Sequence, residues 1–287
     1  MKSIKRGFSI AGLLALAVLS FGLITPQEFQ SLHVVYKVPD MEKVRINHGN
    51  VYKSINGKEL TFDVYYPPES QSGARLPVVI MVLGYSDIIF SQPLKDFEVY
   101  KDWAKLFAAS GMASINYSTL QPASDIHDLI VHIREKADAY GFNPDKIGVW
   151  SCSANVLTAL TLLWGDRQEY LKCASLYYGL MVTPDQKFQK TIMKLSEQVS
   201  FSTAGMEKIK HFHQDLPLFI VRAGRDREDF NQAIEYFGSQ AISKNVPLTI
   251  INYVEGRHAF DVYDDNDASR DIIQQTLNFM RRHLLSN

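Results

Sequence analysis

The sequence contains little cysteine and has almost no net charge. Cys152 and Cys173 are its only cysteines, which is too few for a small fold held together by disulfide bonds. Both lie at the edges of predicted buried strands, so we expect two buried thiols, and a bridge between them is the less favoured alternative. The formal net charge of −1 gives no reason to expect nucleic acid as a partner.

Internal repeats, low-complexity tracts and linkers are missing as well. The composition is ordinary for a globular protein, with 46% hydrophobic and 21% charged residues. Nothing in it marks a boundary between several domains, so we expect one large domain over residues 25–287.

The first 24 residues differ in character from this domain. Three basic residues precede an apolar run over residues 8–24, which is the pattern of an export signal. Cleavage just after Gly22 is one outcome, and because the run is near the lower limit for crossing a bilayer, an uncleaved membrane anchor is the other. We therefore predict a signal peptide or membrane anchor over residues 1–24, and an exported protein that is periplasmic or secreted.

A hairpin signal opens the domain. Asn56 and Gly57 both accept positive φ, as a two-residue turn between antiparallel strands requires. A strand is predicted before the turn, over residues 44–52. Apolar and polar side chains alternate over residues 60–66 after it, which predicts a second, half-buried strand.

The pattern then changes to buried strands that alternate with helices. The run LPVVIMVL at residues 76–83 is continuously apolar, as expected of a strand covered on both faces. Ser124 is expected to cap one of the helices. Further strands are predicted at residues 112–117, 146–150, 173–178, 217–223 and 248–254. This order predicts an α/β fold, with a mostly parallel central sheet, helices on both faces and an N-terminal antiparallel hairpin.

Residues 180–215, here called the insertion, interrupt the alternation. They form a long stretch without a clear strand, and they carry several large apolar side chains. Such a segment above a sheet is commonly functional, so we expect a lid or a pocket wall. A helical excursion on the surface is the alternative.

The stretch IGVWSCSANV at residues 147–156 places Ser153 where a buried strand turns into an apolar helix. Ligands bind at the carboxyl ends of strands in open parallel sheets. A serine there projects its hydroxyl from a sharp turn, and the N–H of Ala154 would point at an oxyanion. A lone serine at a helix start is usually only an N-cap, so other residues must support a catalytic role.

A base and an acid follow at later strand ends. His258 comes just after the last predicted strand, and Asp226 comes just after the strand before it. The order serine, aspartate, histidine is that of a catalytic triad on an α/β-hydrolase sheet. Asp229 is the rival acid, but Asp226 lies closer to its strand and follows Gly224.

From about Leu60 to its C-terminus, the chain resembles α/β-hydrolase serine esterases, near the dienelactone-hydrolase-like and hormone-sensitive-lipase-like carboxylesterases. The resemblance rests on IGVWSCSANV for the nucleophile turn, LFIVRAGRD for the acid strand and GRHAFD for the histidine loop. VVIMVLGY is similar to the strand that ends in His-Gly in those enzymes. The resemblance implies that the N–H groups of Tyr85 and Ala154 form the oxyanion hole and that no cofactor is needed.

The chain departs from that family at three positions. Where the family has the motif G-x-S-x-G, this chain has Ser151 and Asn155 in place of the two glycines. Leu83 replaces the histidine that precedes Gly84 in the family's pattern. No catalytic group is lost by these changes. Asn155 is the largest departure, because its side chain must find both room and hydrogen-bond partners beside Ser153.

The sequence therefore predicts a serine hydrolase that cleaves small-molecule carboxylic esters through an acyl-enzyme. An exopeptidase of the prolyl-oligopeptidase kind is a second hypothesis, although its usual large N-terminal domain does not fit here. The third is an exported, non-catalytic binding protein that retains the hydrolase fold. It would gain support if Asn155 moved the hydroxyl of Ser153 beyond the reach of His258.

The other candidate sites are interpreted as structural, and no metal site is predicted. His211 and His213 lack nearby acidic or cysteine partners, so solvated loop positions are expected for both. His127 and His132 are expected on the surface of a helix. The last group, expected in a solvated loop because it lacks the glycine and terminal glutamate of a calcium site, consists of Asp261, Asp264, Asp265 and Asp267.

Overall fold

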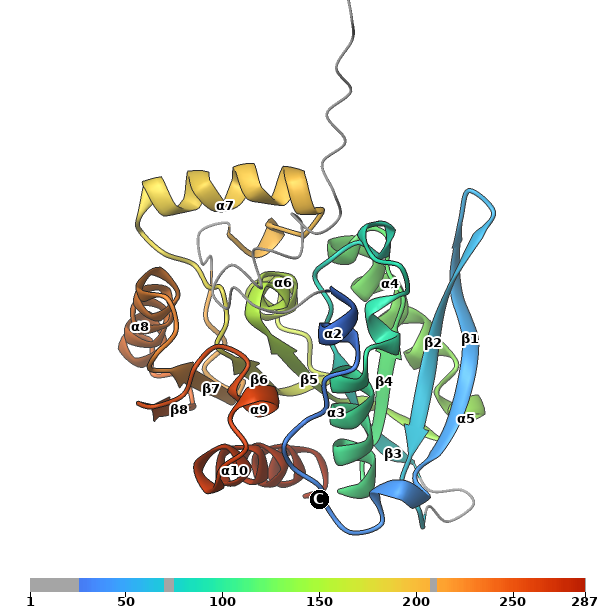
Figure 1. Cartoon of the computed structure of the whole chain (residues 1–287). Coiled ribbons are helices and arrows are strands. Elements are labelled where there is room, and N and C mark those ends of the chain that lie inside the picture. The colour runs from blue at the N-terminus through green and yellow to red at the C-terminus, as the bar shows by residue number, and fades with distance from the viewer. Residues whose placement is uncertain (1–25, 70–74, 207–210, 287) are drawn as a thin grey trace, which may run out of the picture.

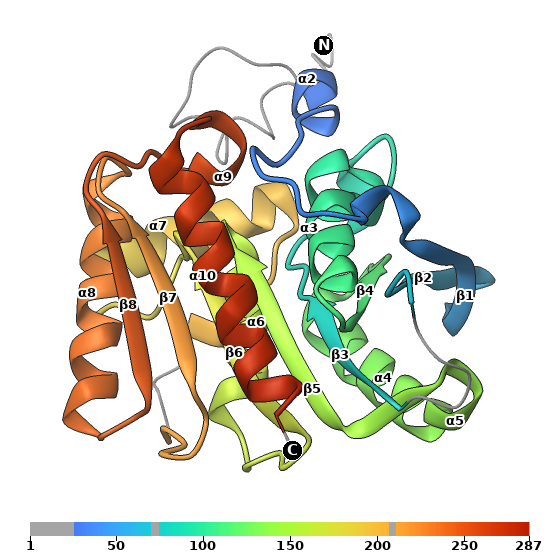
Figure 2. The ribbon, with the colours of Figure 1, turned by 90° about the horizontal axis from the view of Figure 1, so that it is seen from below.

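The computed structural model describes residues 26–69, 75–206 and 211–286, and within them eight strands form one sheet. The order across the sheet is β1-β2-β4-β3-β5-β6-β7-β8 (Figures 1 and 2). The strands are β1 (Arg45–Ile55), β2 (Lys58–Tyr66), β3 (Leu76–Met81), β4 (Ala113–Tyr117), β5 (Phe142–Cys152), β6 (Leu171–Tyr177), β7 (Leu218–Ala223) and β8 (Leu248–Tyr253). β1 and β2 pair in antiparallel fashion, β2 joins β4 in the same way, and all other pairs are parallel.

The turn between β1 and β2 has the geometry that the sequence predicts. Ile55 pairs with Lys58, so only two residues connect the strands. Asn56 and Gly57 occupy these positions with φ of 50° and 79°. The predicted hairpin is therefore confirmed, although β1 extends further toward the turn than residues 44–52.

Helices cover both faces of the sheet. The longer ones are α3 (Glu98–Ala109), α4 (Pro122–Glu135), α6 (Val156–Trp164), α7 (Gln186–Val199), α8 (Glu228–Ser243) and α10 (Asp267–Leu284). The shorter ones are α2 (Pro26–Gln30), α5 (Ala137–Tyr140) and α9 (Phe260–Tyr263), and the 3-10 turns are η2 (Met41–Lys43), η3 (Asp87–Ile89), η4 (Leu94–Asp96), η5 (Ser153–Asn155) and η6 (Ala204–Met206). α3 and α10 pack on one face of the sheet, and α4, α6 and α8 pack on the other (Figure 2).

Burial on both faces explains the apolar strands. In β3, the side chains from Val78 to Met81 are at most 1% exposed. Trp103 on α3 packs against Trp150 on β5, with 4.6 Å between the ring centroids. The predicted α/β fold, with a mostly parallel sheet covered on two sides, is confirmed.

The start of α4 differs from the prediction. The helix begins at Pro122 with Gln121 as its N-cap residue, so Ser124 lies inside the first turn and does not cap it. Proline suits the first helical position because it has no N–H to leave unpaired. The carboxylate of Asp125 accepts hydrogen bonds from the N–H groups of Leu120 and Gln121, at 2.8 and 2.7 Å, which fixes the entry to the helix.

The insertion contains α7 and η6, and Figure 1 shows α7 on the side of α6 that faces away from the sheet. Asp185 caps α7 by accepting from the N–H groups of Lys187 and Phe188. Phe188 and Ile192 are 7% and 4% exposed, so one face of the helix packs onto the domain. The described part of the insertion thus carries a helix at the surface whose inner face packs onto the domain.

The two cysteines are both buried and free, so the alternative of a bridge between them is wrong. The Sγ of Cys173 lies 3.4 Å from the Sδ of Met280 on α10.

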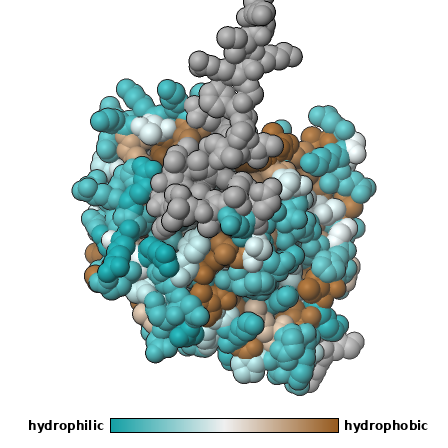
Figure 3. Space-filling model, viewed as in Figure 1, coloured by the Kyte–Doolittle hydropathy of each residue, from teal (hydrophilic) through white to brown (hydrophobic). Residues whose placement is uncertain are grey.

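The predicted export segment lies outside the described residues. No helix in the described ranges combines the length and apolar character that a membrane crossing requires. On the face seen in Figure 3, hydrophilic residues cover most of the surface and apolar residues form patches between them.

Candidate active site

Ser153 stands directly after β5, at the first position of η5, which leads into α6. Its φ is 55°, in the left-handed region that a non-glycine residue adopts only at a cost. A hydrogen bond stabilises the turn, because the carbonyl of Ser153 accepts from the N–H of Leu180 at 3.0 Å. Its hydroxyl caps neither η5 nor α6, so the interpretation of Ser153 as an N-cap is wrong.

The hydroxyl of Ser153 instead meets His258. The distance from Ser153 Oγ to His258 Nε2 is 2.8 Å, and His258 Nδ1 lies 2.6 Å from Asp226 Oδ2. The side chains of His258 and Asp226 are only 5% and 1% exposed. Because a carboxylate can only accept, Nδ1 carries the proton in this arrangement, and Nε2 accepts from the serine hydroxyl.

The carboxyl ends of parallel strands bring these three residues together. Asp226 follows β7 and His258 follows β8, while Ser153 follows β5 in the same sheet. Gly224 permits the close approach of the loops after β7 and β8, because a Cβ there would lie 2.3 Å from the carbonyl oxygen of Val254.

The rival acid, Asp229, is occupied elsewhere. Its carboxylate pairs with Arg227 and accepts from the N–H of Phe230 at 2.9 Å, in the first turn of α8. Asp226 also accepts from the N–H of Arg227 at 2.7 Å through its other oxygen. Of the two candidate acids, the structure therefore brings only Asp226 to His258.

The loop after β3 passes beside the nucleophile turn. The N–H of Val82 donates to the carbonyl of Trp150 at 2.9 Å, which continues the pairing of β3 with β5. At Gly84 the two segments touch, because a Cβ there would lie 2.8 Å from the Cα of Asn155. Tyr85 is the next residue, and its N–H donates no hydrogen bond within the described part of the chain. Ala154 lies at the start of η5, where N–H groups have no partner within the helix.

Ser151 and Asn155, which stand where a G-x-S-x-G motif would have glycines, both bind this loop. The hydroxyl of Ser151 donates to the carbonyl of Val82 at 3.0 Å. The Oδ1 of Asn155 accepts from the N–H of Gly84 at 2.7 Å, and its Nδ2 donates to the hydroxyl of Tyr100 at 2.9 Å. Both side chains are buried. They bind the loop after β3 and leave the hydroxyl of Ser153 in contact with His258.

Asp261 corrects a sequence prediction. It is fully buried in α9 and not solvated, and it accepts from Trp103 Nε1 at 2.8 Å and from the hydroxyl of Tyr178 at 2.7 Å. Burial raises the pKa of this carboxyl, and the two hydrogen bonds counteract only part of that rise. The ring of Tyr178 lies 4.7 Å from the ring of His258, so Asp261 supports the histidine through this tyrosine.

The rest of the acidic run behaves differently. Asp264 pairs with Arg257, whereas Asp265 and Asp267 both pair with Arg270 near the start of α10. Asp265 and Asp267 are exposed as predicted, although Asp267 is the first residue of α10. The side chain of Asp264 is only 9% exposed, so the prediction of a solvated position is wrong for it. A sequence signal for Asp261 was its position between the apolar residues 260 and 262, but the signal does not identify its partners.

Aromatic side chains surround the site, and two of them come from the insertion. Phe230 lies 5.5 Å from the ring of His258, and Phe188 of α7 packs 6.4 Å from Phe230. Phe201, just after α7, packs 5.6 Å from the ring of Tyr85. A cavity of about 410 Å³ opens beside the loop after β3, with walls that include Ile88 and Phe201. A larger one of about 820 Å³ lies between the insertion and α8.

Cys152 immediately precedes Ser153 but does not compete with it as a nucleophile. Burial raises the pKa of its thiol to about 12, so the thiol stays protonated near neutral pH. The thiolate is the reactive form of cysteine, and it is therefore scarce here.

The four other histidines considered from the sequence lie outside this triad. His213 bonds the carbonyl of Gly165 at 2.9 Å, and His211 is exposed. The ring of His132 packs 5.7 Å from that of Phe62, and His127 lies on α4.

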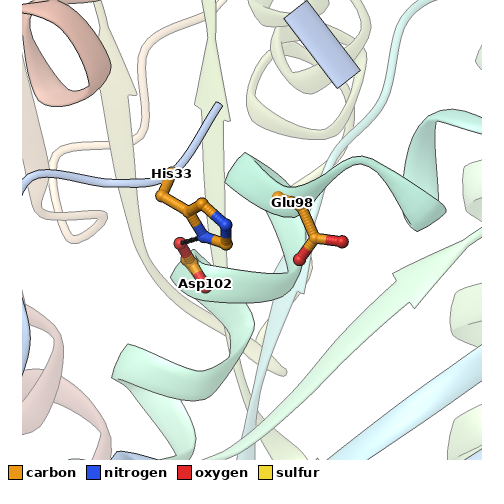
Figure 4. Close-up of side chains that lie close together, drawn as sticks. All are labelled: His33, Glu98 and Asp102. Atoms are coloured by element: carbon orange, nitrogen blue, oxygen red, sulfur yellow. Dashed lines mark hydrogen bonds and ion pairs between the residues drawn. The ribbon is translucent and has the colours of Figure 1, made fainter. Parts of the chain in front are cut away.

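One group that the sequence did not single out is drawn in Figure 4, where His33, Glu98 and Asp102 present ligand atoms within 4.8 Å of one another. His33 bonds Asp102 at 2.8 Å, and Glu98 pairs with Lys101 at 2.8 Å. Asp102 also accepts from the N–H of Val34 at 3.2 Å. The two contacts of Asp102 tie the segment before β1 to α3.

Comparisons with known proteins identify the fold of the chain. No protein-family model and no curated protein matches the chain. Solved structures do match. Esterase 2 of the planctomycete Thermogutta terrifontis, with propionate bound, is 16% identical with a TM-score of 0.67, covering 87% of this chain and 98% of that chain. The same esterase phosphonylated by sarin also gives 16% identity and a TM-score of 0.67, with 87% and 99% covered. The chain therefore has the α/β-hydrolase fold.

Proposed function

We propose that this protein is a serine hydrolase that cleaves carboxylic esters. The observation that carries the proposal is the unbroken chain of hydrogen bonds from Ser153 through His258 to Asp226, at 2.8 and 2.6 Å. A serine hydroxyl needs a base to become a nucleophile, and the base needs an acid to hold its tautomer. All three groups are present at bonding distance.

In the proposed first half-reaction, Ser153 Oγ bonds to the ester carbonyl carbon while its proton passes to Nε2 of His258. The carbonyl oxygen becomes an oxyanion, which the N–H groups of Tyr85 and Ala154 stabilise. The bond from carbon to the alkoxy oxygen then breaks. Nε2 delivers its proton to that oxygen, and the alcohol leaves.

In the second half-reaction, water attacks the acyl-enzyme and gives a proton to His258. The bond from the acyl carbon to Ser153 Oγ breaks, the proton returns to Oγ, and a carboxylic acid leaves. The buried carboxylate of Asp226 stabilises the imidazolium that forms in both halves. No step requires a metal or an organic cofactor.

One observation favours an active enzyme over a non-catalytic binding protein. A second favours an ester as the substrate. Asn155 turns toward the loop after β3, so the condition that would have favoured a binding protein is not met. The structurally similar Thermogutta terrifontis protein is an esterase described with propionate or butyrate bound. By analogy, we propose esters of short acyl chains as the first substrates to test.

The test is labelling with a fluorophosphonate probe combined with hydrolysis of p-nitrophenyl propionate. Wild-type protein should be labelled and should release p-nitrophenol, and Ser153→Ala should do neither. Ser196→Ala, which removes an exposed hydroxyl on α7, is the matched control and should behave as wild type. An unlabelled wild-type protein, or a labelled Ser153→Ala variant, would contradict the proposal.

We also propose that the chain is exported, on the basis of the basic residues and apolar run over residues 1–24. N-terminal sequencing of protein from fractionated cells tests this. A mature chain that begins near residue 23 in the periplasm or medium supports cleavage, and a full-length chain in the membrane fraction supports an anchor. A full-length chain in the cytosol overturns the proposal.

A further inference from the structure

We infer that the insertion orients the oxyanion hole, with Ser200 and Ser202 as positioning residues for the N–H of Tyr85. This inference rests on the proposed function, because it assigns a role in the same reaction. It concerns backbone groups only, and these come from a segment far along the chain from both β3 and Ser153.

The peptide group that joins Gly84 to Tyr85 is the centre of the argument. A trans peptide is planar, so its C=O and N–H point in opposite directions. The carbonyl oxygen of Gly84 accepts a hydrogen bond from the N–H of Ser202 at 2.8 Å. That bond fixes the rotation of the peptide group, and it thereby fixes the direction of the Tyr85 N–H.

The next peptide group is held by the same segment. The N–H of Ser86 donates to the carbonyl of Ser200 at 2.8 Å, and Tyr85 and Phe201 form an isolated antiparallel bridge. The two hydrogen bonds flank this residue pair and do not join it, so the N–H of Tyr85 points away from the insertion. It is thus left available for an oxyanion.

The preceding peptide group is held by a residue of the nucleophile turn. The N–H of Gly84 donates to the buried Oδ1 of Asn155 at 2.7 Å. Three consecutive peptide groups are therefore fixed, two by the insertion and one by the nucleophile turn. Rotation of the central group would break its bond to Ser202 and would strain both neighbours.

The insertion has the means to hold its own position. Ser200 ends α7 with a φ of 47°, and this left-handed residue turns the chain toward the loop after β3. Phe201 follows and is only 7% exposed, packed against the ring of Tyr85. Side-chain packing thus anchors the backbone contacts that orient the donor.

The main test compares Ser202→Pro with Ser202→Ala in the full chain, because only proline removes the N–H that binds Gly84. With p-nitrophenyl propionate, the kcat of Ser202→Pro should be about 10²-fold below that of Ser202→Ala, since losing one oxyanion-hole donor costs about 10²- to 10³-fold. KM should differ by less than about threefold, because a donor that acts only on the oxyanion affects the transition state. Circular dichroism and thermal unfolding verify that both variants fold.

A second pair keeps the inference testable if the proline variant does not fold. Ser200→Gly accepts the left-handed φ of this position, whereas Ser200→Val opposes it. The kcat of the valine variant should be about 10-fold or more below that of the glycine variant, with KM again little changed. Equal kcat values within the folded pairs, or a loss confined to KM, would overturn the inference while wild-type turnover leaves the proposed function intact. A wild-type protein that is neither labelled by fluorophosphonate nor active overturns both.

Discussion

The two sides of the candidate site are held in different ways. On one side, Ser153, Asp226 and His258 follow parallel strands of one sheet, and the sheet itself brings them together. On the other side, the loop that carries Tyr85 donates a hydrogen bond to Asn155 and forms two more with the insertion. The first arrangement is part of the fold, and the second depends on contacts that this particular sequence makes.

The difference indicates where change is tolerated. A residue on the sheet side contributes a reacting group that no neighbour can replace. A residue on the loop side contributes an orientation, which several hydrogen bonds share. We therefore expect large losses from single changes on the first side and graded losses on the second.

After the loss of Ser153 itself, the largest effect should come from Asp226→Asn on the sheet side. The amide would place a donor against Nδ1 of His258 and favour the wrong tautomer, so kcat should fall about 10³- to 10⁴-fold. Asp229→Asn is the matched control, because its carboxylate pairs with Arg227, and its kcat should stay within about threefold of wild type. Equal losses in the two variants, measured with p-nitrophenyl propionate, would contradict the assignment of the acid.

Gly84→Ala addresses the loop side. The added Cβ would lie 2.8 Å from the Cα of Asn155, so the loop must shift, and a shift of about 1 Å can cost about 10²-fold in kcat. Gly165→Ala is its control, because a Cβ at that position would meet nothing within 4 Å. A fully active Gly84→Ala variant would show that the loop adapts without loss.

Asp87, in the same loop after β3, should make the stability of the fold depend on pH. Burial raises the pKa of Asp87 from 3.8 to about 6. Between about pH 4 and 6 the folded chain then binds more protons than the unfolded chain, so the free energy of unfolding falls as the pH rises through that window.

Replacement by asparagine removes this dependence. Between pH 4.5 and 7, urea unfolding should show that the free energy of unfolding falls by about 2 kcal/mol less for Asp87→Asn than for wild type. The amide can still accept from one of the two N–H groups, of Thr119 and Leu94, that the carboxylate binds. Parallel curves for the two proteins would mean that Asp87 stays ionised in both states.

A smaller effect is expected from Asp261→Asn. Asp261 binds the hydroxyl of Tyr178, whose ring packs against the sheet-side residue His258. Asparagine offers only one acceptor to Trp103 and Tyr178, so one buried donor is left unpaired at a cost of about 2 kcal/mol. Thermal unfolding should show a melting temperature lower by about 2–4 °C per kcal/mol. The exposed Asp265→Asn is the control, and an equal melting temperature for the two variants would argue against a buried role.

Much of the sheet side could be predicted from the sequence. The run at residues 76–83 identified β3 because a strand covered on both faces must be continuously apolar. The same logic located β7, and the alternation of strands with helices located β8, which is partly exposed at the edge of the sheet. The positions of Asp226 and His258 at the ends of these strands followed. Strand burial is a local signal, which is why these elements were accessible without a structure.

The loop side could not be predicted in the same way. The sequence indicated that Asn155 needs partners, but Gly84 is identified only once β3 and β5 lie side by side. The pairing of Phe201 with Tyr85 has no local signature, since it is an isolated bridge. Asp261 was misassigned because its acidic neighbours at residues 264, 265 and 267 suggested solvent, while its partners are distant in the chain.

The left-handed φ of 55° at Ser153 has a consequence for selection. Glycine adopts this conformation without the penalty of about 1 kcal/mol that a side chain incurs, so Ser153→Gly should melt at a higher temperature than the equally inactive Ser153→Ala. A variant library screened only for heat resistance would therefore tolerate loss of the nucleophile. Retention of serine at this position requires a screen that scores turnover, because folding alone favours its replacement.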